Sequence, residues 1–479
     1  MQLRVVRALL EEGADMDDVH VEGGRNTAEQ PHDPGAEARA DVTVDAAGGL
    51  VRPPFVEPHI HLDATLTAGE PRWNSSGTLW EGIAVWSERK PSVTREDVLS
   101  RAEQVLRWQA AQGVLFVRSH CDVTDPQLTA LDALVELRDR VRDVMTLQVV
   151  AFPQEGIVSF PGGAELLEEA VRRGADVVGA IPHFEDTRED GVRSIEIAVD
   201  IAERHGVRID AHCDEIDDEQ SRFVEVLATL ALRRGLGDRV TASHTTAMGS
   251  YNGAYAYKLQ RLLVRSGINL VSNPLINLAL QGRFDDYPKR RGLTRVKELL
   301  AAGVNVAFGS DDVMDPWFPL GTASPMTVAH SGVIAAQLTG QPEIAETFEM
   351  VSSRGARVLG VQAEYGVQVD RPANLVVLPA SSRMDAVRRQ VAPRWVVSRG
   401  RVVAERDLAP ARLAWVDDTT YPVDFVRDVD APAATWREAV RHTPSSSAPA
   451  LAPTPRAPGP APTPRRAHEP SGSDLEEAR

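Results

Sequence analysis

The stretch FVEPHIHLD, residues 55–63, decides how the rest of this sequence is interpreted. It begins as an apolar run and ends with His59 and His61, two residues apart, followed by Asp63. If the run is a β-strand, residues i and i+2 point to the same side. The two imidazoles would then project from one face, close enough to bind one metal ion. The alternative is that the two histidines are merely packed in the interior of a barrel or sheet and bind no metal. The rest of the sequence has to decide between these interpretations.

Composition narrows the class of protein. The chain has 479 residues, 43% of them hydrophobic, and a formal net charge of −17. This acidic balance argues against nucleic-acid binding and fits a small neutral substrate better than a polyanion. No run approaches the roughly 18 to 20 apolar residues of a membrane helix, and the N-terminal stretch turns acidic before a signal-peptide core. We therefore expect a cytoplasmic protein without membrane association.

From residue 54 onward, short β-branched runs alternate with longer segments whose apolar residues recur at helical spacing. Two of these segments, 221–235 and 293–303, end in glycine, which commonly terminates helices. Eight strand–helix repeats are typical of a (β/α)8 TIM-like barrel, the α/β fold that we predict. A doubly wound open sheet is the alternative, but no glycine-rich phosphate loop follows the first strand. The predicted strands are PPFVEPHIH, GVLFVRSHCD, MTLQVVAFPQE, ADVVGAIPHFE, VRIDAHCDE, RVTASHTTA, INLVSNPLIN and VNVAFGSDD.

The two ends of the chain predict further units. Strand-like pieces occur before the barrel, such as LRVVRAL, and after it, such as ANLVVLPA. We expect residues 1–53 and 366–415 to form one small composite β-sandwich beside a barrel of residues 54–365; two unrelated edge hairpins are the alternative. Residues 416–479 form an extension. From about residue 428 it is a Pro/Ala-rich tail, expected to be disordered because it has few large apolar residues to bury.

Polar and titratable residues gather where the predicted barrel strands end. In this fold the active site lies at the carboxyl ends of several strands. Histidines scattered for structural reasons would not follow that pattern. The residues are His59 and His61 (first strand), His120 and Asp122 (second), Gln154 and Glu155 (third), His183 (fourth), His212, Asp214 and Glu215 (fifth), His244 (sixth), and Asp311 and Asp312 (eighth).

Three imidazoles and one carboxylate suit a divalent transition metal that keeps one position open for water. The predicted ligands are His59, His61, His212 and Asp311. Such a metal lowers the pKa of its bound water toward ~7. Glu215, three residues after His212, is placed to move protons to a substrate ring nitrogen. His244 and Asp311 are expected to hold and deprotonate the water.

One metal is the simpler prediction. Two-metal barrels of this type usually bridge their ions with a carbamylated lysine on a middle strand, and there is no lysine between Lys90 and Lys258. A bridging carboxylate is the alternative. Thiolate ligands are not expected, because Cys121 and Cys213 form no CxxC pair.

Six longer motifs lie between about residues 50 and 405: VEPHIHLD, FPQEG, HCDEIDDEQSRF, TASHTTAM, LQGRFDDYPKRRG and DDVMDPWFPLGT. Together they resemble the bacterial cytosine deaminases of the amidohydrolase superfamily. The resemblance implies hydrolytic deamination of cytosine to uracil and ammonia in pyrimidine salvage, with one divalent metal, iron(II) or zinc. It assigns the metal ligands and proton-transfer groups to the residues named above. It adds Gln154, Asp312 and Trp317 as groups that bind the free nucleobase, and it implies a homo-oligomer.

The sequence departs from the expected pattern at Ser310, where histidine is expected, and at Gly249, where a bulkier residue is expected. Met314, Phe318 and Pro325 also differ. No predicted metal ligand or acid–base group is lost. Ser310 is next to the predicted ligand Asp311, however, so we expect it to affect the hydrogen bonds that support this ligand and the size of the pocket. An amidohydrolase acting on another cyclic amidine, such as isoguanine, creatinine or an aminotriazine, is therefore the alternative. A non-enzymatic barrel with a structural metal would leave the acid–base groups without a purpose.

Overall fold

A computed structural model describes residues 1–34, 40–407, 411–414, 420–423 and 425. The tail that we predict from about residue 428 lies outside these residues. Among the helices that the structure describes, none is long and apolar enough to cross a membrane.

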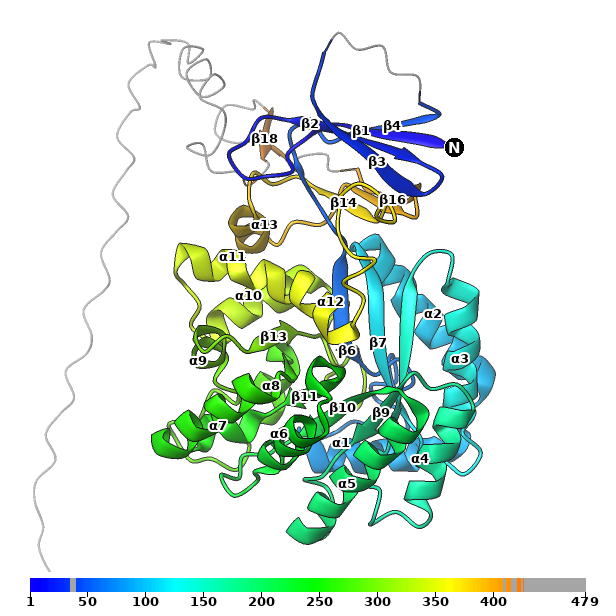
Figure 1. Ribbon diagram of the computed structural model, residues 1–479, viewed down its shortest axis with the longest axis vertical. Helices are drawn as coiled ribbons and strands as arrows, with labels where there is room; N and C mark the ends of the chain where they lie inside the picture. Colours follow the sequence, from blue (N-terminus) through cyan, green and yellow to red (C-terminus); the bar gives the residue numbers. More distant parts are fainter. Residues whose placement is uncertain (35–39, 408–410, 415–419, 424, 426–479) are drawn as a thin grey trace, which may run out of the picture. The chain divides into compact units, whose positions relative to one another are not determined.

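Eight parallel strands form one sheet, in which each strand pairs with the next along the chain (Figure 1). The first and last strands also meet. The His61 N–H donates to the Asp311 carbonyl oxygen at 2.9 Å, and the Asp311 N–H donates to that of His59 at 2.8 Å. The predicted barrel is therefore confirmed, and predicted site residues form its closing seam. The strands are β6 (Phe55–Ile60), β7 (Val114–Asp122), β8 (Thr146–Phe152), β9 (Val177–Ala180), β10 (Arg208–Cys213), β11 (Val240–His244), β12 (Asn269–Ser272) and β13 (Asn305–Phe308).

Helices follow the strands and surround the barrel, as the alternating pattern predicts (Figure 1). The helix in 221–235 buries Leu227, Ala228 and Ala231 and ends before Gly235, which takes the left-handed conformation at φ 65°. Between the barrel strands lie α1 (Leu79–Arg89), α2 (Arg95–Ala111), α3 (Thr129–Val141), α4 (Gly163–Arg172), α5 (Arg188–His205), α6 (Phe223–Arg234), α7 (Gly253–Ser266), α8 (Pro274–Leu280) and α9 (Val296–Ala301). After the last strand come α10 (Pro325–Ala335), α11 (Gln341–Met350), α12 (Ser353–Leu359) and α13 (Arg383–Arg389).

Two four-stranded sheets from the ends of the chain share an apolar core that includes Leu3, Val19, Val51, Leu375 and Val397. Strand β5, which precedes the barrel, pairs antiparallel with β14, which follows it. The composite β-unit is therefore confirmed, whereas its domain boundaries stay predictions. The first sheet contains β1 (Gln2–Ala8), β2 (Asp17–Glu22), β3 (Arg25–Pro31) and β4 (Val42–Asp45); the second contains β5 (Leu50–Arg52), β14 (Leu375–Leu378), β15 (Trp395–Ser398) and β16 (Arg401–Glu405).

Two hairpins were not predicted from the sequence. Strands β2 and β3 pair antiparallel, but β3 is largely exposed and polar, so it lacks an apolar strand signal. Strands β17 (Ala411–Ala414) and β18 (Thr420–Val423) also pair, on either side of the predicted division at residue 415.

Candidate active site

The carboxyl ends of the barrel strands bring the predicted site residues together. One narrow pocket opens there, lined by His61, Leu79, Gln154, Ile181, His212, Glu215, Leu280, Asp311, Asp312 and Trp317. His59 and His244 are fully buried and contact members of this lining. Groups from strands far apart in the sequence thus face one small space, as a barrel active site requires.

Four donor atoms converge beside this pocket. Nε2 of His212 lies 3.2 Å from Nε2 of His59 and 3.1 Å from Nε2 of His61. Oδ1 of Asp311 lies 3.2 Å and 3.3 Å from the same nitrogens of His59 and His61. Ligands bonded at ~2.0–2.1 Å to one metal lie about 3 to 3.4 Å apart, so this spacing fits a single ion. Lone pairs of buried imidazoles repel at such distances unless a cation lies between them, which makes this His/Asp cluster a metal-binding arrangement.

A second overlapping set also meets the distance requirement. One ligand atom from each of His59, His212, His244 and Asp311 lies within 4.8 Å of the others. His244 and His61 therefore compete for assignment as the third histidine ligand. The spacing of Nε2 atoms given above favours His61, and His244 has a different set of close partners.

His244 lies between two carboxylates. Its Nδ1 is 3.0 Å from Oε1 of Glu215 and 3.7 Å from Oδ2 of Asp311. Burial lowers the pKa of His244, but the charges of Glu215 and Asp311 outweigh it and raise the pKa to about 8. This triad can hold and move a proton beside the pocket.

The backbone at two of these residues is strained. His244 has φ 69° and Asp311 has φ 66°, in the left-handed region that side chains with a Cβ rarely adopt. Such conformations cost of order 1–3 kcal/mol each and cluster at functional sites. Both residues stand at or just after the end of a barrel strand, where the turn aims their side chains toward the pocket.

Asp312 and Asp315 form a second pair of buried carboxyl groups. Burial, together with the charges of Asp315 and Asp311, raises the pKa of Asp312 well above its usual range. Burial also raises the pKa of Asp315, to about 6. A protonated Asp312 can donate a hydrogen bond into the pocket, which an ionised carboxylate cannot do.

Trp317 forms one wall of the pocket, packed against Trp86 of α1. Gly82 on the same helix makes room for it, because a Cβ at Gly82 would lie 2.3 Å from Trp317 Cδ1. The indole therefore has a fixed position from which it can stack on a flat ring. Gln154, in the turn after β8, is also buried and contributes an amide to the lining.

Four supporting residues were missed from the sequence. Asn273 Nδ2 donates to Asp311 Oδ2 at 3.2 Å, and Asn277 Nδ2 lies 3.1 Å from His244 Nδ1. Both asparagines follow β12, the one barrel strand for which we predicted no site residue, and their i, i+4 spacing was the available signal. Ser243 immediately precedes His244 in β11, and Asp210 lies two residues before His212 in β10. Both therefore lie further from the carboxyl ends of their strands than the histidines that we predicted.

The positions that depart from the family pattern do not line the central pocket. Ser310 is buried, and its N–H donates to Glu57 Oε1 at 3.0 Å. Together with Met314 and Asp312, it lines a neighbouring cavity on the other side of Asp312. Gly249 lies elsewhere: a Cβ there would be 2.7 Å from the carbonyl oxygen of Leu293, so close backbone approach explains the glycine.

His120, at the end of the second barrel strand, supports the site through ring packing. Its ring stacks on His59, with centroids 3.8 Å apart. Neither ring nitrogen has a hydrogen-bond partner among the residues that the structure describes. His120 therefore fixes His59 by packing.

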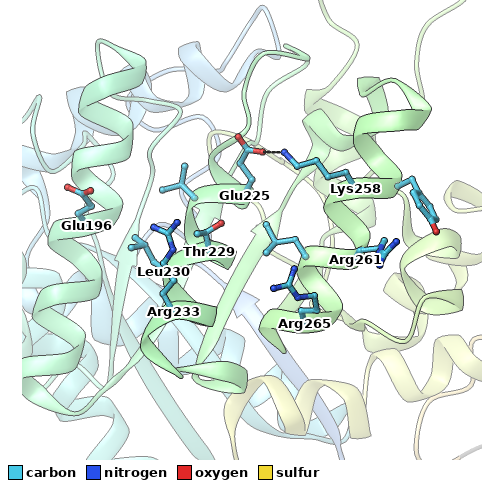
Figure 2. A pocket seen from close by; sticks show the side chains of 11 residues that line it. Glu196, Glu225, Thr229, Leu230, Arg233, Lys258, Arg261 and Arg265 are labelled. Atoms are coloured by element: carbon cyan, nitrogen blue, oxygen red, sulfur yellow. Dashed lines mark ion pairs between the residues drawn. The ribbon is translucent and has the colours of Figure 1, made fainter.

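A larger groove lies outside the barrel, between α5, α6 and α7 (Figure 2). Its lining carries Glu225, Lys258, Arg233, Arg261 and Arg265, and Lys258 pairs with Glu225 at 3.9 Å. No residue of the metal-binding cluster or of the central pocket lines this groove.

Residues 42–404 match the model of the Amidohydrolase family. The chain belongs to this family. It is therefore a hydrolase of C–N bonds, and the superfamily implied by the sequence motifs is confirmed. The His/Asp cluster, the closed barrel and the family agree with one another.

Two curated relatives cover most of the chain. An N-isopropylammelide isopropyl amidohydrolase from Pseudomonas sp. (strain ADP) is 28% identical over 77% of this chain and 89% of its own length. A pterin deaminase from Rhizobium rhizogenes is 30% identical over 75% of this chain and 82% of its own length.

Solved structures include more similar proteins. A 5-methylcytosine deaminase from Klebsiella pneumoniae, liganded with 5-fluorocytosine, is 47% identical and superposes with a TM-score of 0.84. The match covers 86% of this chain and 99% of that one.

Proposed function

We propose that this amidohydrolase deaminates cytosine and 5-methylcytosine as free bases. Water replaces the exocyclic amino group, so that uracil or thymine and ammonia are formed. The observation that supports this proposal most strongly is the composition of the pocket. Its lining combines members of the His/Asp cluster with Gln154, Glu215, Asp312 and Trp317. The similarity to a 5-methylcytosine deaminase that binds 5-fluorocytosine supports this choice of ring.

The donor set fits one divalent ion, for which we propose zinc or iron(II). The residues that would hold it are His59, His61, His212 and Asp311. When bound, such an ion supplies a water activated for nucleophilic attack at neutral pH. The protein's own contribution is to fix the four donors and to exclude bulk water from a buried site.

Proton movement is assigned to Glu215, His244 and Asp311. Glu215 lines the pocket, where it can donate a proton to the ring nitrogen next to the amino-bearing carbon. This protonation makes that carbon more electrophilic. Asp311 and His244 accept the two protons of the water in turn. One restores the proton that Glu215 gave to the ring nitrogen, and the other is delivered to the amino group, which then leaves as ammonia. The 3.0 Å contact between His244 Nδ1 and Glu215 Oε1 joins the two ends of this route.

The remaining lining residues select the ring. The Gln154 amide offers one donor and one acceptor, which suit the adjacent carbonyl and N–H of a pyrimidine edge. Asp312 hydrogen-bonds another edge, and Trp317 stacks on the face. Leu79, Ile181 and Leu280 narrow the space around them, so a base carrying a ribose is not expected to enter.

A panel of free bases tests the substrate. Ammonia release would be measured from cytosine, 5-methylcytosine, isoguanine, creatinine, an aminotriazine and pterin, with zinc- and iron-loaded protein. We expect the highest kcat/KM for cytosine or 5-methylcytosine. Preference for the aminotriazine or pterin, toward which the two curated relatives point, would replace the proposed substrate while keeping the reaction class. Assembly into a homo-oligomer and a cytoplasmic location stay predictions.

A further inference from the structure

A buried chain of hydrogen bonds runs from one proposed metal ligand into the barrel interior. Nδ1 of His59 lies 2.9 Å from Oγ of Ser243, and the Ser243 hydroxyl donates to Asp210 Oδ1 at 2.7 Å. Asp210 Oδ2 accepts a hydrogen bond from the Arg118 guanidinium at 2.8 Å. Arg118, Ser243 and Asp210 are fully buried. These side chains come from β6, β7, β10 and β11, so four strands fix the arrangement.

The direction of these bonds determines where the His59 proton lies. A serine hydroxyl has one proton, and here it is donated to Asp210. Ser243 can therefore only accept from His59, which requires the proton on Nδ1. The lone pair is then on Nε2, the atom that faces His212 and Asp311.

We propose that Ser243, oriented by Asp210, is a positioning residue that holds His59 in the tautomer able to bind the metal through Nε2. The proposal rests on the proposed metal site. Neutral imidazole interconverts between two tautomers, and only one of them presents Nε2 as a ligand. Hydrogen bonds of this kind also fix ring orientation, and their loss typically weakens metal affinity 10- to 100-fold.

His212, another proposed metal ligand, lacks this support. His212 Nδ1 has no hydrogen-bond partner among the described residues. His212 is instead held by stacking on Phe152, with ring centroids 4.0 Å apart. Of these two ligands, His59 is the one whose tautomer is specified by a hydrogen bond before the metal binds.

The substitution Ser243→Ala tests the proposal, with Thr241→Val as the matched control. Thr241 is fully buried on the same strand, two residues earlier, and its hydroxyl has no partner among the described residues. Zinc affinity would be measured by competition with a chelator. We expect about a 10- to 100-fold weaker Kd for Ser243→Ala and little change for Thr241→Val.

A second measurement does not depend on metal. Nitrogen-15 spectra of histidine-labelled, metal-free protein report which ring nitrogen of His59 is protonated, with a His59→Asn sample to assign its signals. We expect an Nδ1–H tautomer in the wild type and a mixture in Ser243→Ala. An Nε2–H tautomer in the wild type, or equal zinc affinity of Ser243→Ala and the wild type, would overturn the proposal. Wild-type protein that binds no zinc would refute the metal site itself, while the tautomer measurement still decides the role of Ser243.

Discussion

The central pocket and the outer groove contrast in size and in construction. The groove encloses about 1450 Å³ of empty space including its open side, against about 320 Å³ for the pocket. The groove's charges lie on helices that face solvent, where Glu225 and Lys258 pair with each other. The pocket's charges are buried, come from separate strand ends and leave lone pairs aimed at one point. Burying such groups costs free energy that folding alone does not require, which supports our assignment of the smaller space as the candidate active site.

The largest expected effect is the loss of a metal ligand. His61→Ala removes one of the four converging donors, so zinc affinity should fall by more than the 10- to 100-fold typical of a lost supporting hydrogen bond. Ammonia release should become undetectable. Metal content after dialysis and turnover are measured, and His205→Ala on the outer end of α5 is the control. Unchanged metal content in His61→Ala would remove His61 from the ligand set and favour His244.

The next effect separates proton transfer from metal binding. Glu215→Gln keeps the shape of the side chain but cannot donate or accept the proton in the same way. We expect kcat to fall about 10²- to 10⁴-fold, with metal content and thermal stability retained. Glu219→Gln, an exposed neighbour in the same acidic run, should behave as wild type. Normal turnover in Glu215→Gln would refute its assigned role.

A smaller effect is expected where the pocket wall depends on a glycine. Gly82→Ala would place its Cβ 2.3 Å from Trp317 Cδ1, so the indole or helix α1 must shift and the pocket wall must change. Overpacking of this kind costs about 1–3 kcal/mol, and we expect roughly a 10-fold loss in kcat/KM for cytosine. Gly253→Ala in α7, where a Cβ meets nothing within 4 Å, is the control. Equal kinetics of the two variants would show that Trp317 does not shape the pocket.

The smallest effect is expected in the groove. Replacing Arg261 and Arg265 together by alanine should leave kcat/KM within about 2-fold of wild type, because surface substitutions usually change stability by only about 0.5 kcal/mol. Steady-state kinetics with cytosine provide the measurement. A loss of activity comparable to that of Glu215→Gln would mean that the groove takes part in function. The functional distinction between the pocket and the groove would then be wrong.

Much of this arrangement could be predicted because the fold ties site residues to strand ends. His59, His61, His212 and Asp311 each lie at or next to the end of a recognisable apolar run, and parallel strands place such ends on one face. The β2–β3 hairpin was missed because its exposed, polar strand carries little apolar signal.

The supporting residues were harder to predict. Ser243 and Asp210 matter through hydrogen bonds that cross the barrel interior, from β11 to β6 and from β10 to β7. The sequence does not state which inward-facing side chains of such separate strands meet. Gly82 matters because Trp317, far away in the chain, packs against it. Ser310 was recognised as a departure, but its place on a separate cavity depends on the turn after β13.

The most direct test of the central claim compares ammonia release from cytosine and cytidine by zinc- or iron-loaded protein and by the same protein stripped of metal. The proposed site predicts turnover of cytosine only, and only with metal bound, because the pocket admits the free base and the ion supplies the activated water. Turnover of cytidine at a similar rate, or turnover of cytosine that survives metal removal, would contradict it.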